Sequence, residues 1–207
     1  MKIFLIAEVF ILVFALVLAV LRSLPGPVFF PLRALAIVYA DLFRGIPTIL
    51  VIYILGFGAP ALGLAGIPTS TIFWGIVSLV LVYSAYVSEV YRAGIESVHP
   101  SQEAAARSLG LTRGQTLRFV VLPQAVRRVI PPLLNDFIGL QKDSALVALL
   151  GTVEAFRQSQ INVAATFNYT PYLATALLFV AITIPLARFT DWLVARDRRR
   201  QLAGRAA

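Results

Sequence analysis

Lys142, Asp143 and Ser144 form a polar run within an otherwise apolar stretch, and they are candidates for contact with a transported solute. A lysine ammonium binds carboxylates and an aspartate carboxylate binds ammonium groups, so together they match the two charges of a zwitterion. Charged groups inside a membrane span are costly and usually face a bundle interior or an aqueous path. Adjacent residues point about 100° apart on a helix, so each charge needs its own partner. The alternative is a structural role in helix packing or at a subunit interface.

A short alanine-rich segment is the second candidate. The sequence predicts a helix over residues 102–109, with Ser101 as its N-cap and Gly110 ending it through a left-handed turn. Ala104 and Ala105 leave part of its surface almost bare, which lets another backbone or a groove approach closely. This helix is therefore predicted to be a docking surface.

The composition places the chain in the membrane class. Of 207 residues, 59% are hydrophobic and 14% are charged. The net charge of +8 does not indicate nucleic-acid binding, because the basic residues alternate with apolar runs instead of lining one face. Cysteine is absent, His99 is the single histidine, and no G-x-x-x-x-G-K-[ST] pattern occurs. We therefore assign no catalytic residue, metal site or cofactor to this chain.

Apolar runs predict an all-α, polytopic membrane protein with about five transmembrane helices in a single domain, residues 1–207. The expected spans are residues 3–21, 32–57, 72–88, 133–150 and 172–189. The first is roughly 28 Å long as a helix, about the thickness of the hydrocarbon core. A cleaved signal peptide is the alternative reading of that run. Pro47 predicts a bend in the second span, and residues 58–71 predict a loop or a re-entrant cap.

The distribution of basic residues predicts the orientation. Lysine and arginine concentrate in cytoplasmic segments of membrane proteins. Here they gather around Arg22, in the loop 89–132 and in the tail 193–207, and all three fall on one side of five spans. The amino terminus is then outside and the carboxyl terminus cytoplasmic, and the outer loops carry few charges.

Two charged groups flank the spans. Glu89, Arg92 and Glu96 are spaced by three and four residues, which predicts a surface ion-pair ladder on one helix. Glu154 and Arg157 are three residues apart, and they either pair with each other or meet a binding protein.

The loop sequence EAAARSLG, followed by VVLP, resembles the EAA loop of permease subunits of binding-protein-dependent ATP-binding cassette (ABC) importers. In that family the loop helix inserts into a cleft on the ATP-hydrolysing subunit. The resemblance implies that Glu103, Ala104, Ala105 and Gly110 are the coupling residues. An ordinary interfacial helix is the alternative.

Three further segments, FRGIPTILV, YSAYVSEVYRAGIESV and GLQKDSALVALLGTVE, look like the polar amino-acid branch of this family. The likeness runs from residue 41 to residue 192. It implies a type I (MetI-like) permease fold and a subunit that carries a polar amino acid across the bacterial cytoplasmic (inner) membrane. A permease for methionine, phosphonate or an opine is the alternative within the class, and a non-transporting scaffold or channel is the alternative outside it.

The resemblance also implies partners. These are an ATP-binding subunit that holds ATP and Mg²⁺, an extracytoplasmic solute-binding protein, a second permease subunit in a homodimer or heterodimer, and membrane lipid. Nucleic acid is not among them.

Overall fold

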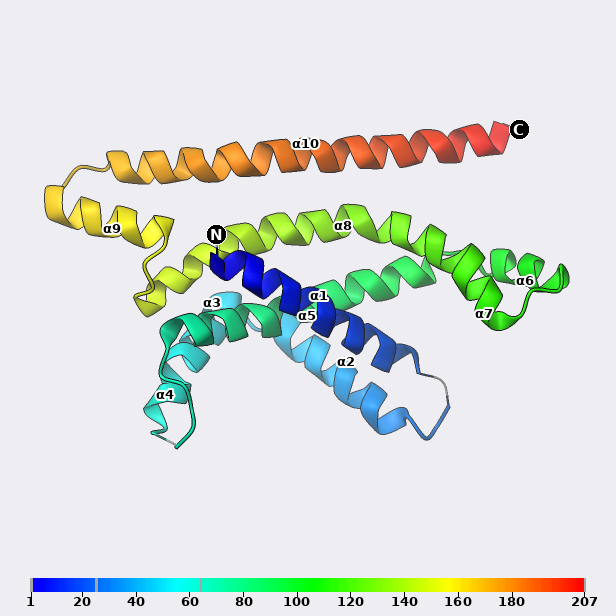
Figure 1. The fold of residues 1–207 in the computed structure, drawn as a ribbon, viewed down its shortest axis with the longest axis horizontal. Helices are drawn as coiled ribbons and strands as arrows, with labels where there is room; N and C mark the ends of the chain where they lie inside the picture. Colours follow the sequence, from blue (N-terminus) through cyan, green and yellow to red (C-terminus); the bar gives the residue numbers. More distant parts are fainter. Residues whose placement is uncertain (1, 25, 64, 207) are drawn as a thin grey trace.

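Helices form the whole framework of the computed structural model, which describes residues 2–24, 26–63 and 65–206 (Figure 1). No β-strand occurs within these ranges, which confirms the predicted all-α class. In chain order the α-helices are α1 (Lys2–Ser23), α2 (Phe30–Gly45), α3 (Thr48–Tyr53), α4 (Ala59–Ala61), α5 (Thr71–Glu96), α6 (Pro100–Ser108), α7 (Arg113–Thr116), α8 (Leu122–Asp143), α9 (Ala155–Thr166) and α10 (Thr170–Ala206). Two π-helical segments, η1 (Ile54–Gly58) and η2 (Leu117–Val121), and one 3-10 segment, η3 (Ser144–Leu150), join some of them.

Among the described residues, three single helices are long and apolar enough to cross a membrane, namely α1, α5 and α10, and a bent helix pair could form a fourth span. The three single helices coincide with the first, third and fifth predicted spans. Helix α5 continues past Ser88 to Glu96, so the first part of the predicted loop 89–132 belongs to this helix. Helix α10 runs on to Ala206, so the described part of the basic tail extends the last span as a helix.

The second predicted span is broken. Helices α2 and α3–α4 meet at an angle of 102°, which confirms the predicted bend at Pro47, although the bend is a break between two helices and not a kink within one. Ile46 and Pro47 both have extended ψ angles, 129° and 133°. A residue before proline is forced out of the helical region by the proline ring, which accounts for a break at this position.

The fourth predicted span, residues 133–150, is formed by the C-terminal half of α8 and by η3. Helix α8 begins earlier, at Leu122, and therefore carries the chain from the basic loop directly into the membrane region. Its charged residues make α8 less apolar than α1, α5 and the first part of α10, as the sequence predicts. Pro131 and Pro132 lie inside α8.

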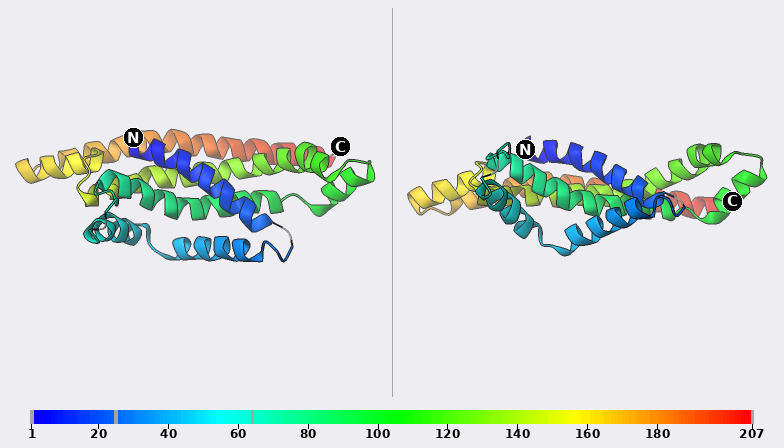
Figure 2. Two further views of the ribbon diagram at one scale, coloured as in Figure 1. Left: turned by 60° about the horizontal axis from the view of Figure 1, so that its bottom comes forward. Right: turned by 90° about the horizontal axis from the view of Figure 1, so that it is seen from below.

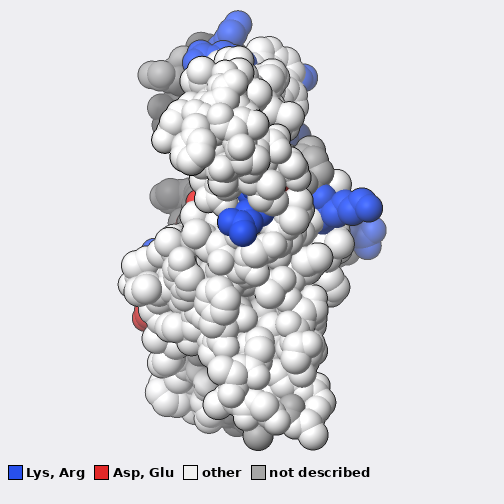
Figure 3. Space-filling model, turned by 90° about the vertical axis from the view of Figure 1, so that its left-hand side faces the viewer, with Lys and Arg blue, Asp and Glu red and all other residues white. Residues whose placement is uncertain are grey.

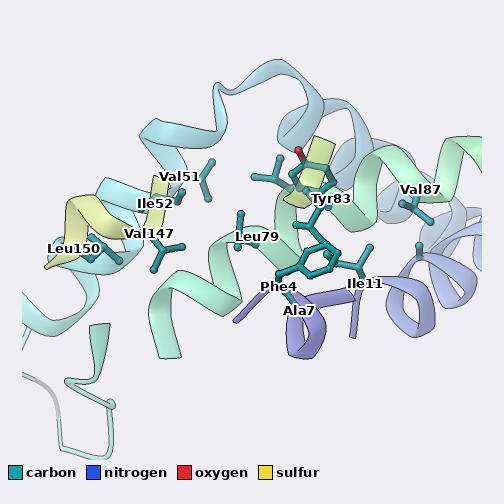
Figure 4. Close-up of a cluster of buried hydrophobic side chains, with 13 residues drawn as sticks. Phe4, Ala7, Ile11, Val51, Ile52, Leu79, Tyr83, Val87, Val147 and Leu150 are labelled. Atoms are coloured by element: carbon teal, nitrogen blue, oxygen red, sulfur yellow. The ribbon is translucent and has the colours of Figure 1, made fainter. Parts of the chain in front are cut away.

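The core lies where α1 crosses α5 (Figure 4). Ala7, Ile11 and Ala15 recur every four residues on α1, and each is completely buried. The small side chains of Ala7 and Ala15 let α1 approach α5 closely, while Val9 and Val13 on the opposite face of α1 are 62% exposed. This arrangement suits a helix between a protein core and lipid.

The two ends of the molecule differ (Figures 1 and 2). Helices α6 and α7 project from one end, and α4 and α9 form the other. The second end carries few charged residues on the face shown in Figure 3. Within this chain α10 packs against α8 and α9, and large apolar side chains such as Leu173 and Leu177 are more than 60% exposed on it.

Candidate functional site

Helix α6 lies in the predicted docking segment, but it begins earlier than expected. Pro100 is its first residue, and the cap is His99, whose Nδ1 accepts a hydrogen bond from the backbone N–H of Ser101 at 3.2 Å. The prediction of Ser101 as the N-cap was therefore wrong. Proline suits the first helical position because that position needs no N–H donor.

The end of α6 has the predicted left-handed turn. Gly110 has a φ of +87°, a conformation that favours glycine. Its N–H donates to the Arg107 carbonyl at 3.0 Å, and the Leu111 N–H donates to the Ala106 carbonyl at 3.3 Å. This pair of bonds is a Schellman motif, which satisfies the last carbonyls of a helix.

The faces of α6 are sharply different. Ala106 is 5% exposed and packs toward the body of the protein, whereas Ala104 and Ala105 are exposed. The bare surface predicted for this helix therefore points away from the rest of the chain. Glu103 lies toward the side that faces α7, where it lines a cavity with Arg113.

Contacts with α5 and α8 hold this segment at the end of the bundle. Val98, Val121 and Ala125 form a small buried cluster of their own. The Arg128 guanidinium donates to the Ser97 carbonyl, which ties α8 to the end of α5. A Cβ on Gly94 would collide with Val129, so glycine at this position permits the close approach of α5 and α8.

The predicted solute contacts lie at the C-terminal end of α8. Asp143 is half-buried and accepts a hydrogen bond from the Tyr83 hydroxyl at 3.0 Å. Lys142 is exposed, and its side chain has no ion pair among the described residues. Ser144 donates to the Gln141 carbonyl at 2.7 Å, so its hydroxyl is used within the helix. The structure thus brings Tyr83 to Asp143, and it directs Lys142 elsewhere, as the helical spacing predicts.

Further polar groups lie near this point of the bundle. Gln141 is 4% exposed, and its side-chain oxygen accepts a hydrogen bond from Thr183 on α10 at 3.2 Å. One carboxylate oxygen of Asp136 is buried, and it has no hydrogen-bond partner in the described part of the chain. The sequence identified the polar residues of α8, but nothing in it singled out Tyr83 or Thr183 as their partners.

The ion pairs around Glu89 are more extensive than the predicted surface ladder. Arg92 bonds Glu89 at 2.8 Å and Glu96 at 2.5 Å, as the spacing predicts. The Glu89 carboxylate also forms ion pairs with the guanidinium groups of Arg22 at 2.6 Å and Arg44 at 3.1 Å. The Arg22 and Glu89 side chains are 10% and 18% exposed, so this cluster joins α1, α2 and α5 below the surface.

Glu154 is a helix cap. Its carboxylate accepts hydrogen bonds from the backbone N–H groups of Phe156 and Arg157 at 2.9 and 2.7 Å, at the start of α9. The Arg157 guanidinium donates to Gln160 instead of pairing with Glu154.

Comparison with known proteins identifies relatives over most of the chain. The family described as binding-protein-dependent transport system inner membrane component matches residues 11–199. A probable glutamine ABC transporter permease protein, GlnM of Bacillus subtilis (strain 168), is 35% identical over 170 residues, which are 82% of this chain and 77% of the relative. The arginine transport system permease protein ArtQ of the same organism is 32% identical over 196 residues, covering 95% of this chain and 87% of ArtQ.

Solved structures have the same fold. A crystal structure of an amino acid ABC transporter with histidines matches with a TM-score of 0.84 and 31% identity, covering 94% of this chain and 89% of that one. An inward-facing structure of the MetNI methionine ABC transporter matches with a TM-score of 0.72 and 20% identity, covering 94% and 91%. The second likeness concerns the fold alone.

Proposed function

Because the chain belongs to the family of binding-protein-dependent transport system inner membrane components, we propose that it is the transmembrane subunit of an ABC importer for a polar amino acid. It is a multi-pass membrane protein with the MetI-like permease fold. Relatives named as glutamine and arginine permeases, at 35% and 32% identity, support an amino acid as the solute.

The observation that carries this proposal is the position of α6. Its bare face, with Ala104 and Ala105, points outward from the end of the bundle where the basic loop lies. A separate ATP-binding subunit, which holds ATP and Mg²⁺, receives this face in a groove. Glu103 and Gly110 complete the set of coupling residues, Glu103 through its charge and Gly110 through the turn that ends the helix.

The solute passes near the outer end of α8. Asp143, oriented by Tyr83 at 3.0 Å, binds the ammonium group, and the exposed Lys142 binds the carboxylate. Ser144 lies beside them in the first turn of η3. One such subunit encloses half a pathway, so a second permease subunit, identical or similar, faces it across a two-fold axis.

The orientation follows from the charges. Helices α6 and α7 and the tail lie in the cytoplasm, the amino terminus lies outside, and a solute-binding protein delivers its ligand to the charge-poor end formed by α4 and α9 (Figure 3). Closure of the ATP-binding subunits then moves the coupling helix and switches the pathway between inward-open and outward-open states.

The coupling step is tested with bulky substitutions on the bare face. Ala105→Trp should abolish co-purification of the ATP-binding subunit, because an indole ring does not fit where a methyl group permits close approach. Ala165→Trp is the matched control, since Ala165 is also exposed but lies on α9 at the other end of the molecule. Undiminished co-purification of the Ala105→Trp variant would contradict the proposal.

The solute assignment is tested by transport in proteoliposomes with the solute-binding protein and ATP-binding subunit present. Asp143→Ala and Lys142→Ala should each lower uptake of the amino acid at least tenfold, since each removes a charge-assisted hydrogen bond. Unchanged uptake in both variants would exclude these residues from the pathway. It would leave the family membership and the role of α6 unaffected.

A further inference from the structure

The C-terminal part of α10 carries a basic stripe, which we define as Arg188, Trp192, Arg196 and Arg199. Successive residues of a helix are rotated by about 100°, so these four side chains lie within an arc of about 80° on one face. All four residues are exposed, the Arg188 side chain by 78% and Trp192 by 49%. The stripe is therefore an open surface of the chain.

The opposite face of α10 makes the contacts with the rest of the protein. Thr183 donates to the Gln141 side chain on α8 at 3.2 Å, and Thr190 is only 4% exposed. Both threonines lie about 160–180° around the helix from the middle of the stripe. Leu177 and Ile184, which are 68% and 54% exposed, precede the stripe on its own side of the helix. One exposed face of α10 thus changes from apolar to basic along its length.

Two aromatic residues relate the stripe to the bilayer. Tyr172 and Trp192 are about 20 residues apart on α10, or roughly 30 Å, which is the thickness of the hydrocarbon core. Tyrosine and tryptophan are enriched at the two membrane interfaces. With Trp192 at one interface, Arg196 lies about 6 Å and Arg199 about 10 Å beyond the core, at the level of the lipid headgroups. Arg188 lies one turn inside the core edge, and its long side chain can extend to the interface.

The Arg196 guanidinium is positioned by aromatic rings and not by a carboxylate. Its central carbon lies 5.2 Å from the centroid of the Trp192 ring, which stacks on Phe189 at 5.9 Å. Neither Arg196 nor Arg199 forms an ion pair with a side chain that the structure describes, whereas Arg188 pairs with Asp191 at 3.4 Å. Guanidinium groups bind phosphate oxygens through two parallel hydrogen bonds. The two unpaired arginines therefore match phosphate groups at the membrane surface.

Protein partners fit this face less well than lipid does. A second copy that packed on the stripe about a two-fold axis would bring the same arginines together and oppose like charges. Helices that associate in membranes do so through small residues, as α1 does at Ala7 and Ala15, whereas Leu177 and Ile184 are large. A cytoplasmic subunit does not reach the first half of the stripe, because Arg188 lies within the segment of α10 that crosses the bilayer.

We propose that the stripe binds the headgroups of anionic phospholipids in the leaflet around the C-terminal part of α10. Arg196 and Arg199 donate to the phosphate oxygens, Trp192 lies at the interface, and the acyl chains follow the apolar side that holds Leu177 and Ile184. The assignment of this leaflet to the cytoplasmic side rests on the orientation given under the proposed function. The sequence of residues 193–207, with five arginines and one aspartate, adds to the attraction for a negatively charged surface.

Quenching of tryptophan fluorescence by brominated lipids tests the stripe. The chain has two tryptophans, so a Trp74→Phe background leaves Trp192 as the single reporter. This chain is reconstituted into vesicles that mix phosphatidylglycerol and phosphatidylcholine, with one or the other lipid brominated, and the quenching gives their relative affinity at Trp192. Phosphatidylglycerol should be preferred about fivefold, and high ionic strength should weaken the preference.

Variants in this background separate the stripe from net charge and from folding. Arg196→Gln combined with Arg199→Gln should reduce the preference to about one, and Arg196→Lys combined with Arg199→Lys should keep most of it, since the charge carries the attraction. Arg113→Gln combined with Arg118→Gln is the matched control, because it removes the same charge from exposed positions on α7 and η2. All these variants should keep the unfolding temperature of the background chain.

The outcomes distinguish this proposal from the transport function. Equal quenching by the two lipids, or an unchanged preference after Arg196→Gln and Arg199→Gln, would overturn the stripe, and so would an equal loss in the matched control. Dissociation of the ATP-binding subunit or of the second permease subunit from the glutamine variant, with an unchanged lipid preference, would assign the stripe to that subunit instead. Failure of the Ala105→Trp test would refute the coupling role and leave the lipid preference intact.

Discussion

Replacing Glu89 by glutamine would remove the carboxylate that Arg22, Arg44 and Arg92 share. The three nitrogen–oxygen distances are 2.6, 3.1 and 2.8 Å. The Arg22 side chain is only 10% exposed, so the substitution leaves its charge without a counter-ion in a place that water reaches poorly. Arg44 and Arg92, which are 41% and 38% exposed, can turn to solvent.

The expected loss of unfolding free energy in Glu89→Gln lies between two limits. Removing one partner of a fully buried ion pair destabilises a protein by about 3–5 kcal/mol, whereas an exposed pair contributes about 0–1 kcal/mol. Since Arg22 is nearly buried and Glu89 is 18% exposed, we expect the free energy of unfolding to fall by roughly 2 kcal/mol. Most of this loss comes from Arg22, because the other two arginines remain solvated.

A double-mutant cycle measured by thermal unfolding in detergent tests this reasoning. Glu89→Gln and Arg22→Gln should each lower the unfolding temperature, and the double variant should lose little more than either single variant, with a coupling energy of about 1–2 kcal/mol. Glu96→Gln is the control, because this carboxylate is 61% exposed and its one ion pair with a described residue is that with Arg92. Additive losses in the double variant would refute the idea that the stranded Arg22 charge causes the effect.

Three further substitutions test local features. Gly94→Ala should lower the free energy of unfolding by about 1–3 kcal/mol, and with it the unfolding temperature, since its Cβ would collide with Val129. Adding Val129→Ala should restore most of this loss, and a double variant without rescue would contradict the packing argument. Gly110→Ala should lower the free energy of unfolding by about 1–2 kcal/mol and reduce ATPase coupling, because the φ of Gly110 is +87°. Gly114→Ala on α7 is the control and should change neither unfolding nor ATPase activity. Equal effects of the two substitutions would disprove this reasoning. Tyr83→Phe removes the hydroxyl that donates to the Asp143 carboxylate on α8. Transport in proteoliposomes should therefore fall severalfold, while the unfolding temperature stays nearly constant. Full transport would exclude a role of Tyr83 in orienting Asp143.

Local patterns predicted much of the fold because their causes act within a few residues. Gly110 ends α6 as expected, and Pro47 breaks the second span. The position of the α6 cap could not be predicted so well. The side chains of Ser101 and His99 can both accept a hydrogen bond from a backbone N–H group. His99 is the N-cap because Pro100 takes the first helical position.

Contacts between distant segments were not predictable from one sequence. Tyr83 and Asp143 are separated by 60 residues, and Arg22 and Glu89 by 67. Each of these residues had a local interpretation, Tyr83 as part of an apolar span and Glu89 as part of a surface ladder. Only the way α1 and α8 pack on α5 determines which partners they meet. The polar character of the site was therefore predicted, but its hydrogen-bond network was not.

The proline pair inside α8 divides this helix into two halves with different attachments. The N-terminal half is fixed to the end of α5 through the bond from Arg128 to the Ser97 carbonyl. The C-terminal half ends at Asp143. Pro131 and Pro132 lack N–H groups, so the hydrogen-bond ladder is interrupted between the halves and the helix bends there most easily. A displacement of the N-terminal half would therefore tilt the C-terminal half, which ends at Asp143, about the proline pair.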